Sequence, residues 1–201
     1  MESWLVPEWR SVQVPVLALD ELRARASARQ DNMDPATLSY GVTSEDMNLV
    51  GLLGEDAVLR WLTEQGAEVQ SIADDPTSIA TGQGDLQLSF SPTGWTRIVA
   101  HVEVKTSRRR DYARFERTVV SSQLSRMACD AVFWCTAEDD LADRGIVDIM
   151  GWLPCADAQA PEYHEPAEAR GRPAVRIKRP LRDPSEFMSW LDSEARKRPP
   201  F

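Results

Sequence analysis

The sequence has few cysteines, lysines and histidines. Of its 201 residues, three are cysteine and two are histidine, and only three of the 23 basic residues are lysine. The cysteines are Cys129, Cys135 and Cys155, and the lysines are Lys105, Lys178 and Lys197. Three widely spaced cysteines fit neither a disulfide framework nor a zinc or iron–sulfur cluster, so we expect a reducing, cytoplasmic environment. Any lysine with a chemical role must be one of three.

Long apolar runs are also missing. No stretch reaches the roughly 18 apolar residues that a membrane-spanning helix needs. The first ten residues, MESWLVPEWR, lack the basic start and apolar stretch of a secretory signal. Hydrophobic residues make up 42% of the chain and charged residues 27%, which is typical of a globular protein. The length suffices for one domain with its own core, or for one domain with an appended arm.

Acidic residues outnumber basic ones. The net charge is −9 at pH 7, which argues against a protein that coats nucleic acid through bulk charge. Residues 101–127 differ from the rest, with seven basic and three acidic side chains. Arg108, Arg109 and Arg110 stand together in this segment. They are candidates for holding a phosphate backbone, and the alternative is a solvated run of charge.

The chain divides into an N-terminal arm, residues 1–43, and a main domain, residues 44–201. A helix is expected over residues 17–30 of the arm, which could pack on the main domain or on a partner. The main domain opens with a helix that Thr43 or Ser44 can cap and that ends at Gly66.

The remaining elements follow from alternating and apolar patterns. We expect strands at residues 68–73, 85–90, 95–106, 131–135 and 146–153, a short edge strand at 174–178, and helices at 121–130 and 185–197. The pattern predicts an antiparallel hairpin over residues 85–106. It predicts an ordered loop or a crossover over residues 156–173. This order predicts an α/β fold with a central mixed sheet flanked by helices.

Glu55 lies within the apolar stripe of the first helix of the main domain. It is three residues after Leu52 and four before Leu59. A carboxylate on the core side of a helix is costly unless a partner satisfies it. Gly54, beside it, would let another backbone approach closely. The alternative is a glutamate that reaches solvent at the edge of the stripe.

Three more charged residues stand on the hairpin. Asp85 begins its first strand, and Glu103 and Lys105 share one side of the second strand because alternate residues point the same way. Two converging carboxylates suit Mg²⁺ or Mn²⁺, and a nearby ammonium can orient or activate a metal-bound water. His101 shares the face of Glu103 and could line the site. The alternatives are a surface ion pair for Glu103 and Lys105 and a turn residue for Asp85.

This set of residues resembles the PD-(D/E)XK nuclease superfamily, in its restriction-endonuclease-like and Holliday-junction-resolvase-like branches. The matching pieces are Gly54-Glu55, Gly84-Asp85, Glu103-Val104-Lys105, the helix at Ser121-Ser122-Gln123 and the buried strand at residues 131–135. The resemblance implies an αβββαβ core and metal-dependent cleavage of DNA. It implies that Asp85 and Glu103 bind the metal, Lys105 is the catalytic lysine, Glu55 completes the site and Gln123 supports it.

The sequence departs from parts of this pattern. Asp85 follows glycine rather than proline, and Met127 stands where the RecB-like branch has a tyrosine. The four cysteines of Cas4-like members are absent. A chance acidic-x-Lys triplet is common, so the specificity comes from the placement of Glu103 and Lys105 in an apolar strand.

Three functions remain open at this point. The first is a Mg²⁺- or Mn²⁺-dependent DNA endonuclease, for example in repair or phage defence. The second is a catalytically silent module of the same fold that binds proteins of a DNA-processing complex. The third is an RNA endonuclease. The acidic charge of the chain also suggests that a protein partner or a homo-oligomer contributes to DNA binding.

Overall fold

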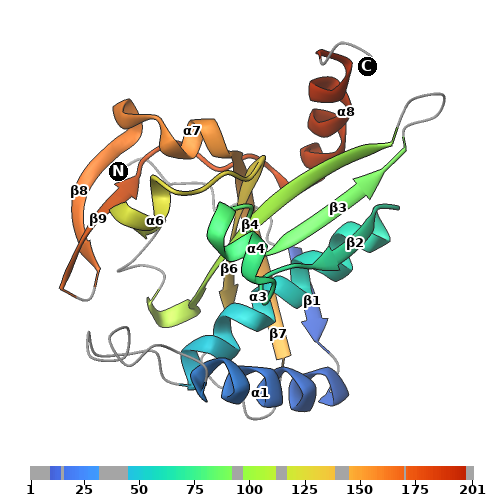
Figure 1. Ribbon diagram of the computed structural model, residues 1–201, viewed down its shortest axis with the longest axis vertical. Helices are drawn as coiled ribbons and strands as arrows, with labels where there is room; N and C mark the ends of the chain where they lie inside the picture. Colours follow the sequence, from blue (N-terminus) through green and yellow to red (C-terminus); the bar gives the residue numbers. More distant parts are fainter. Residues whose placement is uncertain are drawn as a thin grey trace, which may run out of the picture.

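The computed structural model describes residues 10–14, 16–31, 45–91, 97–111, 117–138, 145–169 and 171–197 (Figure 1). The first half contains β1 (Arg10–Val14), α1 (Val16–Asp31), α3 (Glu45–Glu64), β2 (Glu68–Ser71), α4 (Pro76–Thr81), β3 (Leu86–Phe90) and β4 (Ile98–Arg108). The second half contains β5 (Thr118–Val120), α6 (Ser121–Leu124), β6 (Ala131–Ala137), β7 (Gly145–Pro154), α7 (Cys155–Gln159), η1 (Pro161–Tyr163), β8 (His164–Ala169), β9 (Arg172–Ile177), η2 (Pro184–Glu186) and α8 (Phe187–Lys197).

Six strands form the main sheet, in the order β1-β7-β6-β4-β3-β2. The neighbours β4 and β6 run parallel, and the other pairs run antiparallel. The predicted hairpin is confirmed, because β3 pairs with β4 from Leu86 opposite Val102 to Phe90 opposite Ile98. The protein is therefore an α/β protein with a mixed central sheet, as predicted.

Apolar side chains fill both faces of this sheet. One core lies between the sheet and α1, α3 and α8, and its centre contains Phe133 and Phe187 with ring centroids 4.8 Å apart. The second core, on the other face, includes Trp134 and Leu153 from the sheet with residues of β5, α6, α7 and β9. All seven residues of β6 are buried, as the apolar run at residues 131–135 predicts. Within the described residues, no helix is both long and apolar enough to cross a membrane.

The described part of the N-terminal arm packs on the main domain. Strand β1 pairs antiparallel with β7 at the edge of the sheet, and α1 lies against α3 (Figure 1). Leu19, Leu22 and Ala26 of α1 are buried in the first core. Of the two placements considered for the arm, packing on the main domain is the one observed for residues 10–14 and 16–31. The predicted caps of α3, Thr43 and Ser44, lie outside the described residues.

Residues 156–173 differ from the prediction. Instead of a loop, they form α7, η1, β8 and the start of β9. Strand β9 was expected at an edge, but it is the central strand of a second sheet of order β5-β9-β8. The sequence His164–Ala169 alternates half-buried and exposed residues, but it lacks the β-branched residues that mark strands, and Pro166 further obscures the pattern.

The helix expected over residues 121–130 is also shorter, since α6 ends at Leu124. The chain turns away because its backbone finds a partner elsewhere: the Ala128 N–H donates to the Gly82 carbonyl at 2.7 Å. Asp130 is likewise drawn to β4, where its carboxylate accepts a hydrogen bond from the His101 backbone N–H at 2.8 Å. These bonds bring residues 126–130 beside the candidate site.

Candidate active site

Helix α3 crosses β4 at very short range where the candidate residues lie. A methyl group added to Gly54 would lie 1.8 Å from Thr106 Oγ1 and 2.9 Å from Thr106 Cβ. Only a residue without a side chain permits this approach. The close approach predicted at Gly54 is therefore observed, but the nearest atoms belong to the Thr106 side chain and not to backbone. The neighbouring Glu55 lies near enough to Asp85 to act on its carboxylate.

Asp85 is held by the backbone of β4. Its N–H donates to the Val102 carbonyl at 2.9 Å, and its Oδ2 accepts a hydrogen bond from the Val104 N–H at 2.7 Å. Gly84 makes this geometry possible, because it has a φ of +100° and a Cβ there would lie 2.7 Å from the Val102 oxygen. The carboxylate is thereby fixed against the residue that separates Glu103 from Lys105.

Glu103 and Lys105 share one face of β4, as strand alternation predicts. On the neighbouring strand they lie opposite Val132 and Trp134, which belong to the second core. The Lys105 ammonium donates a hydrogen bond to Glu103 Oε1. The side chain of Lys105 is 27% exposed and that of Glu103 is 15% exposed, so this ion pair is largely shielded from solvent.

Electrostatics places the four predicted residues in one group. Burial and the nearby Glu103 and Glu55 carboxylates together raise the pKa of Asp85 to about 8, against the opposing effects of Lys105 and the Val104 N–H. Burial disfavours the Lys105 ammonium, but Glu103 and Asp85 outweigh it and hold the pKa of Lys105 above its usual value. Glu55, Glu103 and Lys105 thus all act on Asp85, although they come from α3 and β4 and Asp85 directly precedes β3.

Sequence reasoning missed the partner of Glu55. Arg29, from α1, donates from Nη1 and Nη2 to the two carboxylate oxygens of Glu55, at 3.0 and 3.1 Å. Its Nε donates to Asp74 at 2.6 Å, and Arg25 also donates to Asp74 at 2.8 Å. Burial opposes the charge on Arg29, yet Glu55 and Asp74 raise its pKa above the ordinary value. This two-pronged contact satisfies the buried carboxylate that the stripe pattern identified.

The charges of the group do not balance. Three carboxylates, of Glu55, Asp85 and Glu103, face two cations, Arg29 and Lys105. Among the described residues, no three His, Cys, Asp or Glu side chains are arranged to hold a metal ion. Two of the carboxylates have cationic partners, because Arg29 engages both oxygens of Glu55 and Lys105 engages one oxygen of Glu103. Asp85 and Glu103 still supply the two hard oxygen donors with which Mg²⁺ sites are commonly built.

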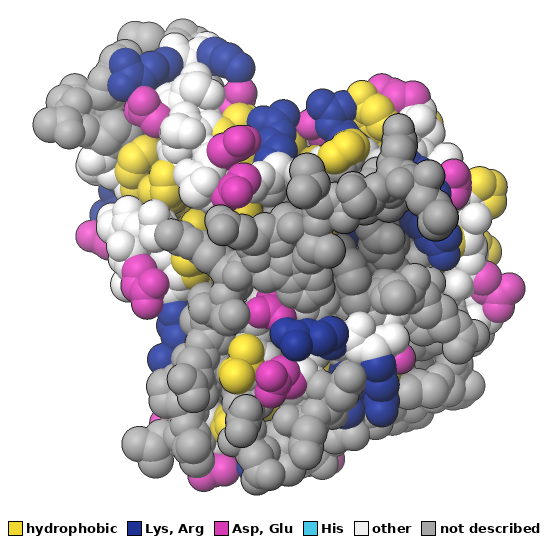
Figure 2. Space-filling view, turned by 180° about the vertical axis from the view of Figure 1, so that it is seen from behind, with side chains coloured by type: hydrophobic (Ala, Val, Ile, Leu, Met, Phe, Trp, Pro, Cys, Tyr) yellow, Lys and Arg dark blue, Asp and Glu magenta, His cyan; other side chains and the backbone are white. Residues whose placement is uncertain are grey.

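The basic segment is only partly available for binding. Arg109 pairs with Asp148 of β7, whose side chain is 3% exposed. Arg110 lies 3.9 Å from Asp111 at the surface, and Arg108 is half-buried at the end of β4. On the face in Figure 2, described basic and acidic side chains lie interspersed and do not form one broad field.

Gln123 lies on α6, where its side chain is exposed, and its carbonyl accepts a hydrogen bond from the Arg126 N–H at 3.0 Å. His101 is half-buried on β4, on the same face as Glu103.

Comparison with known proteins adds no relative: no family model, curated protein or solved structure matches this chain. The site must therefore be interpreted from its own geometry.

Proposed function

We propose that this protein is a metal-dependent nuclease that hydrolyses phosphodiester bonds, most specifically a DNA endonuclease. The observation that carries the proposal is that Asp85 reaches β4, where its carboxylate accepts a hydrogen bond from the Val104 N–H, between Glu103 and Lys105. Burial together with the neighbouring carboxylates raises the pKa of Asp85 to about 8. Such an unbalanced group of acids is a favourable place for a divalent cation.

The order of elements supports a restriction-endonuclease-like core. Along the chain, α3 is followed by β2, β3 and β4, then by α6 and β6, with α4 and β5 as short additions. Strands β2, β3 and β4 pair antiparallel in sequence, and β6 adds parallel to β4. This order supports the αβββαβ core that the resemblance implies, with Asp85 directly before the second strand and Glu103 and Lys105 on the third.

Each residue has a distinct proposed role. Asp85 and Glu103 would hold Mg²⁺ or Mn²⁺, which when bound supplies an activated water and offsets charge on the scissile phosphate. Lys105 presents an ammonium beside Glu103, where it can orient the attacking water and stabilise the developing negative charge. Glu55 would complete the site from α3, and Arg29 holds its carboxylate in position.

The proposal that DNA is the substrate rests on the positions of basic side chains near the site. Arg108 and Arg110, close beyond Lys105 on the chain, can contact a phosphate backbone, and Gln123 adds a polar group on α6. A net charge of −9 predicts weak and salt-sensitive binding of DNA, so a protein partner or a second copy of the chain would strengthen it. A cytoplasmic location is consistent with the free thiols of Cys129, Cys135 and Cys155.

The test is cleavage of supercoiled plasmid by the full chain with Mg²⁺ or Mn²⁺. Asp85→Asn and Lys105→Met keep the size of each side chain but remove its charge, and we expect either change to abolish cleavage. Asp20→Asn and Lys197→Met make the same changes at exposed positions and should cleave like the parent. If Asp85→Asn and Lys105→Met cleave as well as the parent, the assignment is wrong. A labelled RNA tested in parallel would identify an RNA nuclease.

One observation favours the silent module as the second candidate. Two of the three carboxylates already have cationic partners, and no metal-holding cluster of three is found among the described residues. A module that only binds proteins would keep these ion pairs permanently. It would cleave neither nucleic acid under any metal and would bind Mn²⁺ no better than Asp85→Asn does.

A further inference from the structure

Two cysteines that are far apart in the sequence meet beside the active site. Cys129 precedes β6, and Cys155 begins α7 directly after β7. The antiparallel pairing of Ala131 with Pro154 brings these chain ends together, and the Cys155 N–H donates to the Asp130 carbonyl at 2.9 Å. Both thiols are free.

The two sulfurs contact each other. Their side chains form a hydrogen bond with each other, and the Cys129 backbone N–H donates to the Cys155 sulfur. These bonds lower the pKa of Cys155, and the same thiol contact, with burial, raises the pKa of Cys129. Cys135 differs, since it is buried in the first core, where burial raises the pKa of its thiol.

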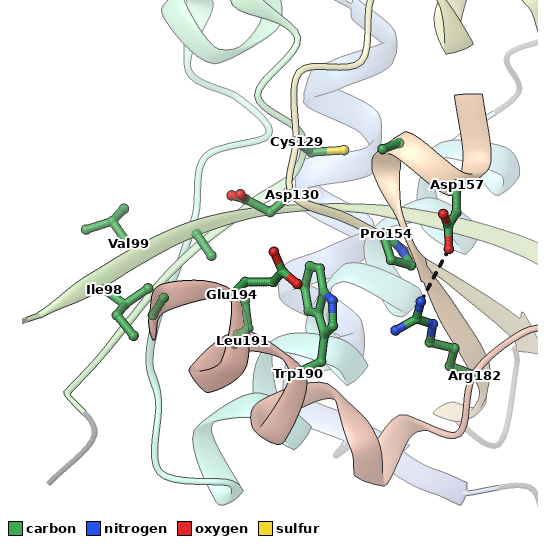
Figure 3. A pocket seen from close by; sticks show the side chains of 13 residues that line it. Ile98, Val99, Cys129, Asp130, Pro154, Asp157, Arg182, Trp190, Leu191 and Glu194 are labelled. Atoms are coloured by element: carbon green, nitrogen blue, oxygen red, sulfur yellow. Dashed lines mark hydrogen bonds and ion pairs between the residues drawn. The ribbon is translucent and has the colours of Figure 1, made fainter. Parts of the chain in front are cut away.

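One of the two cysteines lines a cavity that is open to the outside. Cys129 is half-buried and lines an open cavity of about 440 Å³ between the start of β4, α7 and α8. Figure 3 shows its sulfur directed toward Pro154 and α7, above Asp130 and Trp190. Cys155 is 5% exposed and is not among the lining residues. A small oxidant in the cavity can therefore reach Cys129 first, with Cys155 behind it.

We propose that Cys129 and Cys155 form a reversible oxidation site that reacts with small-molecule disulfides such as oxidised glutathione. Cys129 attacks one sulfur of the reagent as its proton passes to Cys155, which breaks the reagent's S–S bond and releases one thiolate. Cys155 then gives that proton to the released thiolate and attacks Cys129, which releases the second reagent thiolate. The two cysteines lose two electrons and form a disulfide, and the reagent is reduced to two thiol equivalents.

The site adjoins the proposed catalytic group but does not depend on it. Glu103 acts electrostatically on both sulfurs, and Cys129 acts on Lys105. Oxidation removes the thiolate and its hydrogen bonds from this neighbourhood, so the surroundings of Glu103 and Lys105 change with the redox state. The covalent test below gives a result whether or not the protein is a nuclease.

The experiment uses the full chain carrying Cys135→Ala, because trypsin leaves Cys129 and Cys135 on one peptide, residues 127–144. The folded protein is treated with oxidised glutathione, remaining thiols are alkylated, and the digest is analysed without reduction. We expect a peptide covering 127–144 linked to one covering 145–170, the loss of two hydrogens from the intact mass, and reversal by dithiothreitol. Adding Cys129→Ser or Cys155→Ser should abolish the linked peptide.

Two outcomes would overturn the inference. The first is glutathione bound to Cys129 with no linked peptide after prolonged treatment, because the pair would then not close. The second is linkage that forms only when urea is present, because the unfolded chain would then be the reactive species. A circular dichroism spectrum recorded before alkylation establishes that the treated protein is folded.

Discussion

Two buried acidic groups on the same sheet are treated differently by the fold. Asp148 on β7 is 3% exposed in its side chain and has its own guanidinium, that of Arg109. Within the described part of the chain, the Asp85 carboxylate accepts a hydrogen bond from the Val104 N–H and from no cationic side chain, and it shares the electrostatic effect of the Lys105 ammonium with Glu103. One group is neutralised within the fold, and the other has more carboxylates than cations.

The difference indicates where the fold keeps a buried carboxylate without a cationic side chain of its own. A buried carboxylate paired with arginine is a structural arrangement, and removal of its partner destabilises the fold. A buried carboxylate next to other carboxylates destabilises the fold by itself and is a feature of functional sites. On this view Asp148 maintains the structure, and the proposed role of Asp85 is to bind a cation that the described side chains do not supply.

The largest expected contrast is in cation binding. Asp85→Asn should weaken Mn²⁺ binding by about 100-fold or more, since even the loss of a residue that only orients a ligand commonly costs 10–100-fold. Asp148→Asn, the matched change at the neutralised carboxylate, should bind Mn²⁺ like the parent. Titration followed by the electron paramagnetic resonance of free Mn²⁺ measures both. Equal affinity for the parent and Asp85→Asn would remove the distinction between the two regions.

A second contrast is in the pH dependence of stability without metal. The pKa of Asp85 is about 8 in the folded chain, against an ordinary value of 3.8, so the folded state favours the protonated acid. Its contribution to stability is complete below about pH 4 and is lost as the pH rises to about 8. With chelator present, Asp85→Asn should gain stability over the parent across this range. Urea unfolding at four or five pH values measures the gap, and a gap that stays constant contradicts the raised pKa.

A third experiment removes the cation from the neutralised pair. Arg109→Ala leaves Asp148 buried without its guanidinium and should lower the free energy of unfolding by about 3 kcal/mol. Arg110→Ala, at the neighbouring exposed position, should change it by less than about 0.5 kcal/mol. Thermal unfolding of both variants makes the comparison. Similar values for the two would mean that Asp148 does not depend on Arg109.

The smallest expected effect concerns the approach of α3 to β4. Gly54→Ala places a methyl group 1.8 Å from Thr106 Oγ1 and should destabilise the fold by about 2 kcal/mol. Gly51→Ala, one turn earlier in the same helix, meets nothing within 4 Å and should stabilise it by up to about 1 kcal/mol. Urea unfolding distinguishes the two, and a stabilising Gly54→Ala would show that the helix can move away from Thr106 freely.

The elements that carry the candidate site could be predicted because local patterns determine them. Alternation marks β3 and β4, a continuous apolar run marks β6, and the apolar stripe of α3 makes Glu55 conspicuous. The second sheet could not be predicted in this way. Strand β8 has the sequence HEPAEA, and its pairing with β9 supplies what local propensity lacks.

The partners within the site depend on contacts between distant segments, which no local pattern records. Arg29 is an ordinary helix residue in the sequence, and only the packing of α1 on α3 brings it to Glu55. Cys129 and Cys155 looked unrelated because their meeting depends on the pairing of β6 with β7. The acids of the group and Lys105 can be identified from the sequence, but Arg29 and the paired thiols beside the group cannot.

The hydrogen bond between Asp85 and the β4 main chain has a consequence for redesign. Because the aspartate is anchored to an amide and not to another side chain, exchanging Glu103 or Lys105 would leave its anchor intact. The charge and size of its neighbours could therefore be varied one at a time around a fixed acid. A chemist who wished to retune this centre would have an immobile reference point from which to begin.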